Sequence, residues 1–205
     1  MSSVSPPLIL ASASPRRSAL LRQLGVVHQV VAADIDERRL DGEGIEECVL
    51  RLARAKAQAA RERLIAAGAL AAGAVVLGAD TGVVLGDELL GKPHTREPAL
   101  AMLRQLSGRE HRVLTGVAVW GESGCDALLS ESRVRFREIT DAECERYWRS
   151  GEPRDKAGAY AIQWLAAAFI AGLHGSYSGV MGLPLYETAE LLQRAGVSIW
   201  QECGE

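Results

Sequence analysis

The sequence lacks the features that mark several protein classes. Aromatic residues make up 5% of the 205 residues and the net charge is −3. The chain therefore lacks an excess of positive charge and lacks interleaved aromatic and basic residues, the features that favour binding to nucleic acid or to an anionic membrane. The longest apolar stretch, residues 164–173, is about half a membrane span. With no repeat, low-complexity tract or linker, the length suits one domain over residues 1–205, with room for two lobes.

Metal-binding and nucleophile motifs are also missing. None of the four histidines has a partner at metal-ligand spacing, and the chain contains neither a Gly-x-Ser-x-Gly elbow nor a Walker loop. Leu8-Ile9-Leu10 is too short for a secretory signal. The cysteines lie far apart without a Cys-x-x-Cys pair, which predicts reduced thiols in a cytoplasmic protein rather than a disulfide framework or zinc site. They are Cys48, Cys125, Cys144 and Cys203.

The side chains left that could carry out chemistry are carboxylates, lysines, arginines and hydroxyls. A first group of them lies in residues 75–93. Val75-Val76-Leu77 is typical of a strand buried on both faces. Gly78-Ala79 follows, and then Asp80 and Thr81 stand where this strand is expected to open. A charged cluster at the end of a buried strand is the usual ligand position in α/β sheets. The alternative is a surface ion pair at the mouth of a hairpin.

A hairpin is predicted directly after this cluster. Gly86-Asp87 suits a type II′ turn between two apolar runs. Counting back from the turn pairs Leu85 with Glu88, Val83 with Leu90 and Thr81 with Lys92, and opposed residues have Cβ atoms about 5 Å apart. Asp80 alternates to the other face, so the hairpin alone does not establish a contact between Asp80 and Lys92.

A second cationic cluster is predicted at the start of a helix. Ser14 is a suitable N-cap and Pro15 a suitable first residue, after a strand at residues 8–11. Arg16 and Arg17 then lie in the first turn, where a positive charge opposes the helix dipole. A polyphosphate bound there would explain both arginines, although exposed arginines in a first turn are common.

Two further segments leave alternatives open. The acidic stretch 34–38 follows a predicted strand at residues 26–33 and would either bind a divalent metal or be solvated. A long helix is predicted over residues 44–67, and its apolar stripe of Ile45, Val49 and Leu52 continues into Lys56. The Lys56 ammonium would either reach back to solvent or point inward at a phosphate.

The rest of the chain predicts two loops and several further helices and strands. A charged loop at residues 151–160 contains Lys156, and a Gly/Ser loop at residues 175–184 would leave backbone N–H groups free to meet an anion. The other predicted elements are a helix to Leu106 capped by Thr95, strands at 111–120 and 128–139, a helix at 141–150 opened by a capping box, a helix at 185–195, and a short strand after it.

Taken together, these motifs resemble the Maf family of nucleoside triphosphate pyrophosphatases. In order, they are Ser-Pro-Arg-Arg, Gly-Ala-Asp-Thr, Gly-Lys-Pro, Asp-Lys-Ala-Gly-Ala-Tyr-x-Ile-Gln, and Gly-Ser-Tyr followed by Gly-Leu-Pro. The resemblance covers nearly the whole chain. It implies a mixed α/β fold of the Maf and inosine triphosphatase type, with an elongated twisted sheet flanked by helices and a cleft between two lobes.

The resemblance also implies an activity and roles for individual residues. Members of the family hydrolyse a nucleoside triphosphate to monophosphate and pyrophosphate with a divalent cation, Mg²⁺ or Mn²⁺, and a homodimer is expected. Asp80 matches the proton acceptor and, with Glu37, the metal position; Arg16, Thr81 and Gln163 match positions linked to substrate choice. The phosphate-binding positions are Ser14, Arg17, Lys56, Lys92 and Lys156.

The motifs resemble the dTTP/UTP branch of the family more closely than the 7-methyl-GTP branch. The latter typically has Ser-Pro-Trp-Arg, Asp-Gln and a Glu near the position of Gln163. One departure is Ser178-Gly179, where many members carry Asn. A non-catalytic regulator of septum formation and cell division is the competing function, and such a protein would tolerate loss of Asp80.

Overall fold

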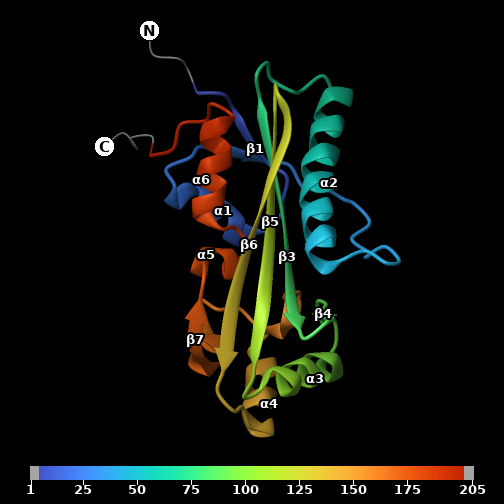
Figure 1. Cartoon of the computed structure of the whole chain (residues 1–205), viewed down its shortest axis with the longest axis vertical. Helices are drawn as coiled ribbons and strands as arrows, with labels where there is room; N and C mark the ends of the chain where they lie inside the picture. The colour runs from blue at the N-terminus through green and yellow to red at the C-terminus, as the bar shows by residue number, and fades with distance from the viewer. Residues whose placement is uncertain (1–4, 201–205) are drawn as a thin grey trace. The chain divides into compact units, whose positions relative to one another are not determined.

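The computed structural model of the protein describes residues 5–200. A seven-stranded sheet has the order β2-β1-β3-β5-β6-β7, with β4 paired to β3. β1 is parallel to β2 and β3, whereas β4 and β7 are antiparallel to their neighbours, which confirms the predicted mixed α/β fold with flanking helices (Figure 1). The elements are β1 Leu8–Leu10, α1 Pro15–Gln23, β2 His28–Val30, α2 Ile45–Ala66, β3 Val75–Leu85, β4 Glu88–Leu90, α3 Arg96–Leu106, β5 Glu110–Gly121, β6 Gly124–Phe136, α4 Asp141–Arg149, η1 Ala157–Ala159, η2 Leu165–Phe169, β7 Ile170–His174, α5 Tyr177–Met181 and α6 Leu185–Arg194.

The chain forms two compact units. The first contains the residues up to Asp80, Thr115–Ser130 and those from Gly182 on, and the second contains Thr81–Leu114 and Glu131–Met181. The strands β3, β5 and β6 contribute residues to both. The single domain over residues 1–205 stays a prediction. Within residues 5–200, no helix is both long and apolar enough to cross a membrane.

In the first unit, α2 lies directly on the strand backbone. An added Cβ at Gly78 of β3 would be 2.3 Å from the Ala53 carbonyl oxygen, and one at Gly116 of β5 would be 2.9 Å from the Val49 carbonyl oxygen. Only glycine permits so close an approach of helix and strand. The two glycines therefore set the height of α2 above the sheet. Apolar residues complete this contact: Ile9, Ala11, Ala57, Ala60 and Val76.

The second unit has its own, larger core. Its helices α3 and α4 cover the end of β6, where Phe136 is 1% exposed. Phe136 packs edge to face against Tyr160 and His111, with ring centroids 4.9 and 5.1 Å apart, a favourable arrangement for aromatic rings. The core also contains Val83, Leu90, Leu100, Leu103, Leu106, Val113, Val134, Ile139, Cys144, Tyr147, Ile162 and Phe169.

The predicted helices are confirmed to within a residue or two, because their caps and stops are local signals. The capping box of α4 forms as expected: Glu143 N donates to Thr140 Oγ1 at 3.3 Å, and Thr140 N donates to Glu143 Oε2 at 2.9 Å. Cys48, Cys125 and Cys144 are free thiols, as predicted. Cys203 lies outside the described residues.

Three strand predictions were wrong in their bounds. The strand predicted at residues 128–139 is β6, Gly124–Phe136. The strand predicted at residues 26–33 is only His28–Val30, because β2 pairs with β1 alone and β1 has three residues. The strand predicted to open at Asp80 and Thr81 instead continues through both residues to Leu85. Its neighbour β5 is 12 residues long, which gives β3 a partner beyond the end of β1.

Two predictions for the C-terminal region were also wrong. The Gly/Ser loop contains α5, and Ser176 caps it: its Oγ accepts Gly179 N at 2.9 Å and its carbonyl accepts Val180 N at 3.0 Å. These N–H groups are therefore used within the loop. No strand follows α6 within residues 195–200, where Val197 N donates to Leu192 O and Trp200 N to Leu24 O instead.

Candidate active site

Asp80 lies in the middle of β3, between the residues that pair with β1 and those that pair with β4. Residues 75–77 of β3 pair with β1, and residues 83–85 pair with β4. Side chains alternate along a strand, so Asp80 shares a face with Gly78, the face on which α2 lies. Asp80 is 9% exposed. A nearly buried carboxylate in mid-strand needs polar partners, because burying an unpaired charge is costly.

Lys56 of α2 supplies that partner. Its Nζ lies 2.6 Å from Asp80 Oδ1 and 2.7 Å from Glu37 Oε1. Lys56 is 6% exposed, so its side chain points inward, one of the two alternatives left by the sequence. It contacts carboxylates here, and both bonds are charge-assisted.

Glu37 is the only acidic residue of stretch 34–38 with a described contact to this cluster. Asp36 instead pairs with Arg38, whose Nη2 lies 2.6 Å from Asp36 Oδ2. Hydrogen bonds from Arg38 lower the pKa of Asp36 to about 2. The stretch is therefore divided between one residue that reaches the buried lysine and neighbours that face solvent.

Arg17, from the first turn of α1, is held by contacts that the sequence did not predict. Its Nε donates to the Gly182 carbonyl at 2.8 Å and its Nη1 to Ser12 Oγ at 3.2 Å. Burial lowers the pKa of Arg17, whereas the negative charges of Asp80 and Glu37 raise it. Arg17 therefore lies close enough to both carboxylates for their negative charge to affect its pKa. Ser12 and Gly182 orient it, and the sequence did not indicate either contact, because Gly182 is distant in the chain and Ser12 lies outside the Ser-Pro-Arg-Arg motif.

The first turn of α1 retains the electrostatic pattern predicted from the sequence. It contains no acidic residue. Ser14 occupies the N-cap position but makes no side-chain capping bond to a described residue, and its own N–H donates to Ser12 Oγ at 3.2 Å. Burial lowers the pKa of Arg16, although a guanidinium stays charged at neutral pH. The helix N-terminus and both arginines thus favour an anion at this end of α1.

In the second unit, the segments that contain Lys92 and Lys156 lie side by side. Gly158 N donates to the Gly91 carbonyl at 3.1 Å. This bond explains why the predicted pairing of Thr81 with Lys92 does not form: the ladder ends at Leu90, and the chain turns instead to the loop at residues 155–160. Lys92 is exposed, and Lys156 Nζ donates to the Arg154 carbonyl at 3.1 Å.

That loop has an unusual backbone. Asp155 and Ala159 have positive φ angles of 57° and 61°, and Gly158 has φ 66°. An added Cβ at Gly158 would be 2.8 Å from Val83 Cγ1. Positive φ at non-glycine residues is uncommon and persists only where the surroundings impose it. The surroundings therefore hold the loop that contains Lys156 in one backbone conformation.

Thr81 and Gln163 are both partly exposed, and both belong to the second unit. Thr81 follows Asp80 directly but points to the opposite face of β3 by alternation. Gln163 lies in a turn just before η2, where Trp164 N donates to the Ala161 carbonyl at 3.3 Å. At the departure from the family pattern, Ser178 Oγ lies 3.1 Å from Ser176 Oγ.

The carboxylates of the first unit fit one mode of divalent metal binding. Among residues 5–200, no group of three or more His, Cys, Asp and Glu could hold a metal ion, so a cage made by protein alone does not fit. Asp80 and Glu37 contact the same ammonium, and Mg²⁺ is commonly held by one or two carboxylates together with substrate phosphates. These two residues fit that arrangement.

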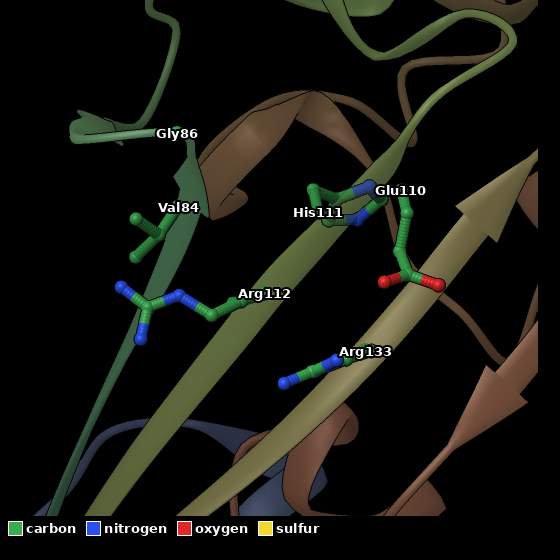
Figure 2. Close-up of a pocket in the computed structure, with 6 residues that line it drawn as sticks. All are labelled: Val84, Gly86, Glu110, His111, Arg112 and Arg133. Carbon is green, nitrogen blue, oxygen red and sulfur yellow. The ribbon is translucent and has the colours of Figure 1, made fainter.

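A pocket of about 250 Å³ lies elsewhere, on the sheet in the second unit, and contains none of the predicted site residues (Figure 2). Arg112 extends from β5 toward Val84, and Arg133 extends from β6 (Figure 2). Glu131 pairs with both, at 3.4 Å from Arg112 Nη1 and 3.6 Å from Arg133 Nε. Both arginines already contact this one carboxylate, and the pocket contains no candidate base of the kind seen in the Asp80 cluster. Its lining consists of Val84, Gly86, Glu110, His111, Arg112 and Arg133.

Comparison with known proteins agrees with this reading of the motifs. The chain is 49% identical over 195 residues to a protein of Hahella chejuensis, covering 95% of each chain. It is 51% identical over 201 residues to one of Ralstonia nicotianae, covering 95% of this chain and 96% of the other. Both relatives are named dTTP/UTP pyrophosphatase. The Ham1 protein of Staphylococcus aureus aligns over 66% of this chain and 72% of its own, at 17% identity and a TM-score of 0.40, which is too low to bear on fold or function.

The family assignment rests on nearly the full length of the chain. The model of the family described as Maf-like protein matches residues 7–195, a range that contains every residue discussed above as part of the candidate site. The chain therefore belongs to the Maf-like protein family.

Proposed function

We propose that this protein hydrolyses dTTP and UTP to the nucleoside monophosphate and pyrophosphate. The observation that carries the proposal is the convergence of Lys56 on Asp80 and Glu37, close to the guanidinium of Arg17. It joins a candidate base to cations suited to a triphosphate. The names of the relatives, dTTP/UTP pyrophosphatase, support this substrate class over 7-methyl-GTP.

In this proposal Asp80 is the general base. Attack of water on the α-phosphorus requires removal of a proton, and the Asp80 carboxylate is the acceptor. The proton moves to Asp80 as the new P–O bond forms, and the bond to the leaving pyrophosphate breaks. A divalent cation held by Asp80, Glu37 and the phosphates would neutralise charge and lower the pKa of the attacking water.

The remaining predicted residues stabilise the charge of the phosphates or recognise the nucleobase. The charge of the phosphates is stabilised by Ser14, Arg16, Arg17, Lys56, Lys92 and Lys156, and Arg16 also takes part in substrate choice. Thr81 and Gln163 contribute to the choice of the nucleobase of the substrate. The expected compartment is the cytoplasm, since the described cysteines are free thiols. Mg²⁺ or Mn²⁺ as the metal, and a homodimer, are further parts of the proposal.

Pyrophosphate release from a panel of nucleoside triphosphates tests the proposal. The panel contains dTTP, UTP, CTP, GTP and 7-methyl-GTP, each with Mg²⁺ or Mn²⁺, and the products are identified by chromatography. We expect monophosphate and pyrophosphate, with the highest kcat/KM for dTTP and UTP. Preference for 7-methyl-GTP would move the chain to the other branch, and binding without turnover would favour the non-catalytic regulator.

A further inference from the structure

Gln163 lies between two backbone segments that are fixed by the same pair of side chains. On one side, Ala161 N donates to Tyr147 Oη at 3.2 Å. On the other, Leu165 N donates to Glu152 Oε2 at 3.0 Å and Ala166 N to Glu152 Oε1 at 3.4 Å. The N–H groups two residues before and two and three residues after Gln163 are therefore bound by Tyr147 and Glu152.

Tyr147 and Glu152 are also bound to each other. Tyr147 Oη donates to Glu152 Oε1 at 2.8 Å, so the two acceptors form one connected group. Tyr147 lies on α4, is 3% exposed, and its ring packs edge to face on Phe169, the last residue of η2, with centroids 5.3 Å apart. Burial, and then the hydrogen bond to Glu152, raise the pKa of Tyr147. The tyrosine is thus a neutral donor held in a fixed place.

The carboxylate of Glu152 has a definite role at η2. The first N–H groups of a helix have no carbonyl partner within it. Leu165 and Ala166 are the first two residues of η2, and Glu152 accepts both of their N–H groups. Negative charge at this end of a helix is favourable. Glu152 therefore fixes where η2 begins, and with it the turn that contains Gln163.

We propose that Tyr147 and Glu152 are positioning residues that set the base preference by holding the turn of Gln163; this inference rests on the proposed function. A glutamine amide has a donor and an acceptor and can flip between two orientations, so it distinguishes uracil from cytosine only when its place is fixed. The alternative is that the pair stabilises the fold without affecting base choice.

The test combines two variants with a matched control. Glu152→Gln keeps the shape of the side chain but loses one acceptor oxygen and the charge. Tyr147→Phe keeps the ring packing on Phe169 and removes only the hydroxyl. The control is Glu145→Gln, also on α4, which breaks the exposed ion pair with Arg96. For each protein, kcat/KM is measured for UTP and CTP, and the Ki of tripolyphosphate reports on phosphate binding without a base.

We expect the ratio of UTP to CTP activity to fall on the order of tenfold in Glu152→Gln and Tyr147→Phe, since a lost or mismatched buried hydrogen bond costs about 5- to 150-fold. The Ki of tripolyphosphate and the Glu145→Gln ratio should change less than twofold. Hydrogen exchange of the amides at residues 161–166 should become at least tenfold faster in both variants, whereas exchange in α2 should not change.

Each outcome decides the proposal. An unchanged UTP to CTP ratio in both variants, whatever their melting temperatures, would overturn it, as would unchanged amide exchange at residues 161–166. An equal loss for UTP, CTP and tripolyphosphate would leave only a structural role and would also overturn it. If the parent protein turns over no nucleotide, the proposed function fails together with this specificity role, and amide exchange still reports whether the pair holds the turn.

Discussion

The ammonium of Lys56 donates a hydrogen bond of 2.6 Å to Oδ1 of Asp80, and both side chains are almost completely buried. The bond fixes one oxygen of the candidate base and connects β3 to α2. Because Glu37 accepts from the same nitrogen at 2.7 Å, the cation lies between two carboxylates. The proposed chemistry, the proposed metal binding and the stability of the fold therefore all involve the contacts of Lys56 Nζ, and each can be tested separately.

Replacing Asp80 with Asn removes the proposed proton acceptor and retains the shape of the side chain. We expect kcat for dTTP to fall about 10²–10⁴-fold, the usual contribution of a positioned general base, while the protein remains folded by circular dichroism. Asp36→Asn is the control, since Asp36 pairs with the exposed Arg38 outside this cluster. Turnover by Asp80→Asn within a few-fold of the parent would show that Asp80 is not the base.

Replacing Lys56 with Met leaves Asp80 and Glu37 close together without their cation. Breaking a buried ion pair typically costs about 3–5 kcal/mol, so the free energy of unfolding in urea should decrease by this order. Mg²⁺ should then stabilise the variant more than the parent, because a divalent cation would bridge the two carboxylates; at 100 times its Kd it contributes about 2.7 kcal/mol. Arg54→Met, on the exposed face of α2, is the control. Equal stabilisation of parent and Lys56→Met by Mg²⁺ would argue against a cation site at these carboxylates.

The sequence predicted the local features of this site better than its contacts. The stripe of α2 placed Lys56 on the apolar side of the helix, because helical periodicity is a property of the segment itself, but it left open whether the ammonium reaches solvent or points inward. It did not indicate that the ammonium meets Asp80, since this depends on how closely α2 approaches β3. That distance follows from Gly78, whose significance appears only when helix and strand are packed together.

The hairpin illustrates the same limit. The turn at Gly86-Asp87 correctly fixed the pairing of Leu85 with Glu88 and of Val83 with Leu90, because register follows from the turn. Extending the count to Thr81 and Lys92 failed, because Gly91 bonds to Gly158, which is distant in sequence. The roles of Tyr147 and Glu152 were likewise invisible, since neither belongs to a motif and both act through backbone N–H groups.

Replacing Gly78 with Ala should damage both stability and activity. The new Cβ would lie 2.3 Å from the Ala53 carbonyl oxygen, so α2 has to move away from β3 and carry Lys56 with it. Overpacking of this kind costs about 1–3 kcal/mol, and kcat of the folded protein should also fall. Gly121→Ala is the control, because its Cβ would meet only Ala195 Cβ at 3.8 Å. A Gly78→Ala protein with the melting temperature and kcat of the parent would contradict this account.

Replacing Gln163 with Glu should change the base preference. Uracil and thymine present an N3–H donor beside the O4 acceptor, which an amide matches, whereas guanine presents two adjacent donors that suit a carboxylate. We expect kcat/KM for dTTP and UTP to fall about 5- to 150-fold, with guanine nucleotides affected less or improved. Values for dTTP, UTP, CTP and GTP on both proteins check this. An unchanged ratio of UTP to GTP activity would remove Gln163 from the base site.

His111 should make the stability of the protein depend on pH. Burial lowers its pKa from 6.5 to about 4; the residue is 2% exposed, and its Nδ1 has no hydrogen-bond partner within residues 5–200. Between these two values the unfolded chain binds a proton that the folded protein excludes, so the free energy of unfolding should fall as the pH decreases from about 6.5 to 4. The total loss is about 3 kcal/mol for a shift of this size.

His111→Phe isolates this contribution, because it keeps a ring beside Phe136 and removes the titrating group. The variant loses the 2.8 Å bond to Tyr160 Oη, so it should be less stable than the parent at pH 7. Its free energy of unfolding should nevertheless decrease less between pH 6.5 and 4, by up to about 3 kcal/mol relative to the parent. Carboxylates paired with arginine, such as Asp36 and Glu143, have pKa values of about 2 in the folded protein. Their contribution to stability begins to fall near their higher unfolded-state pKa values, at the lower end of this window, but this loss is common to parent and variant. Urea unfolding at several pH values gives the free energy of unfolding of parent and variant as a function of pH. If the two curves run parallel, His111 is not the titrating group.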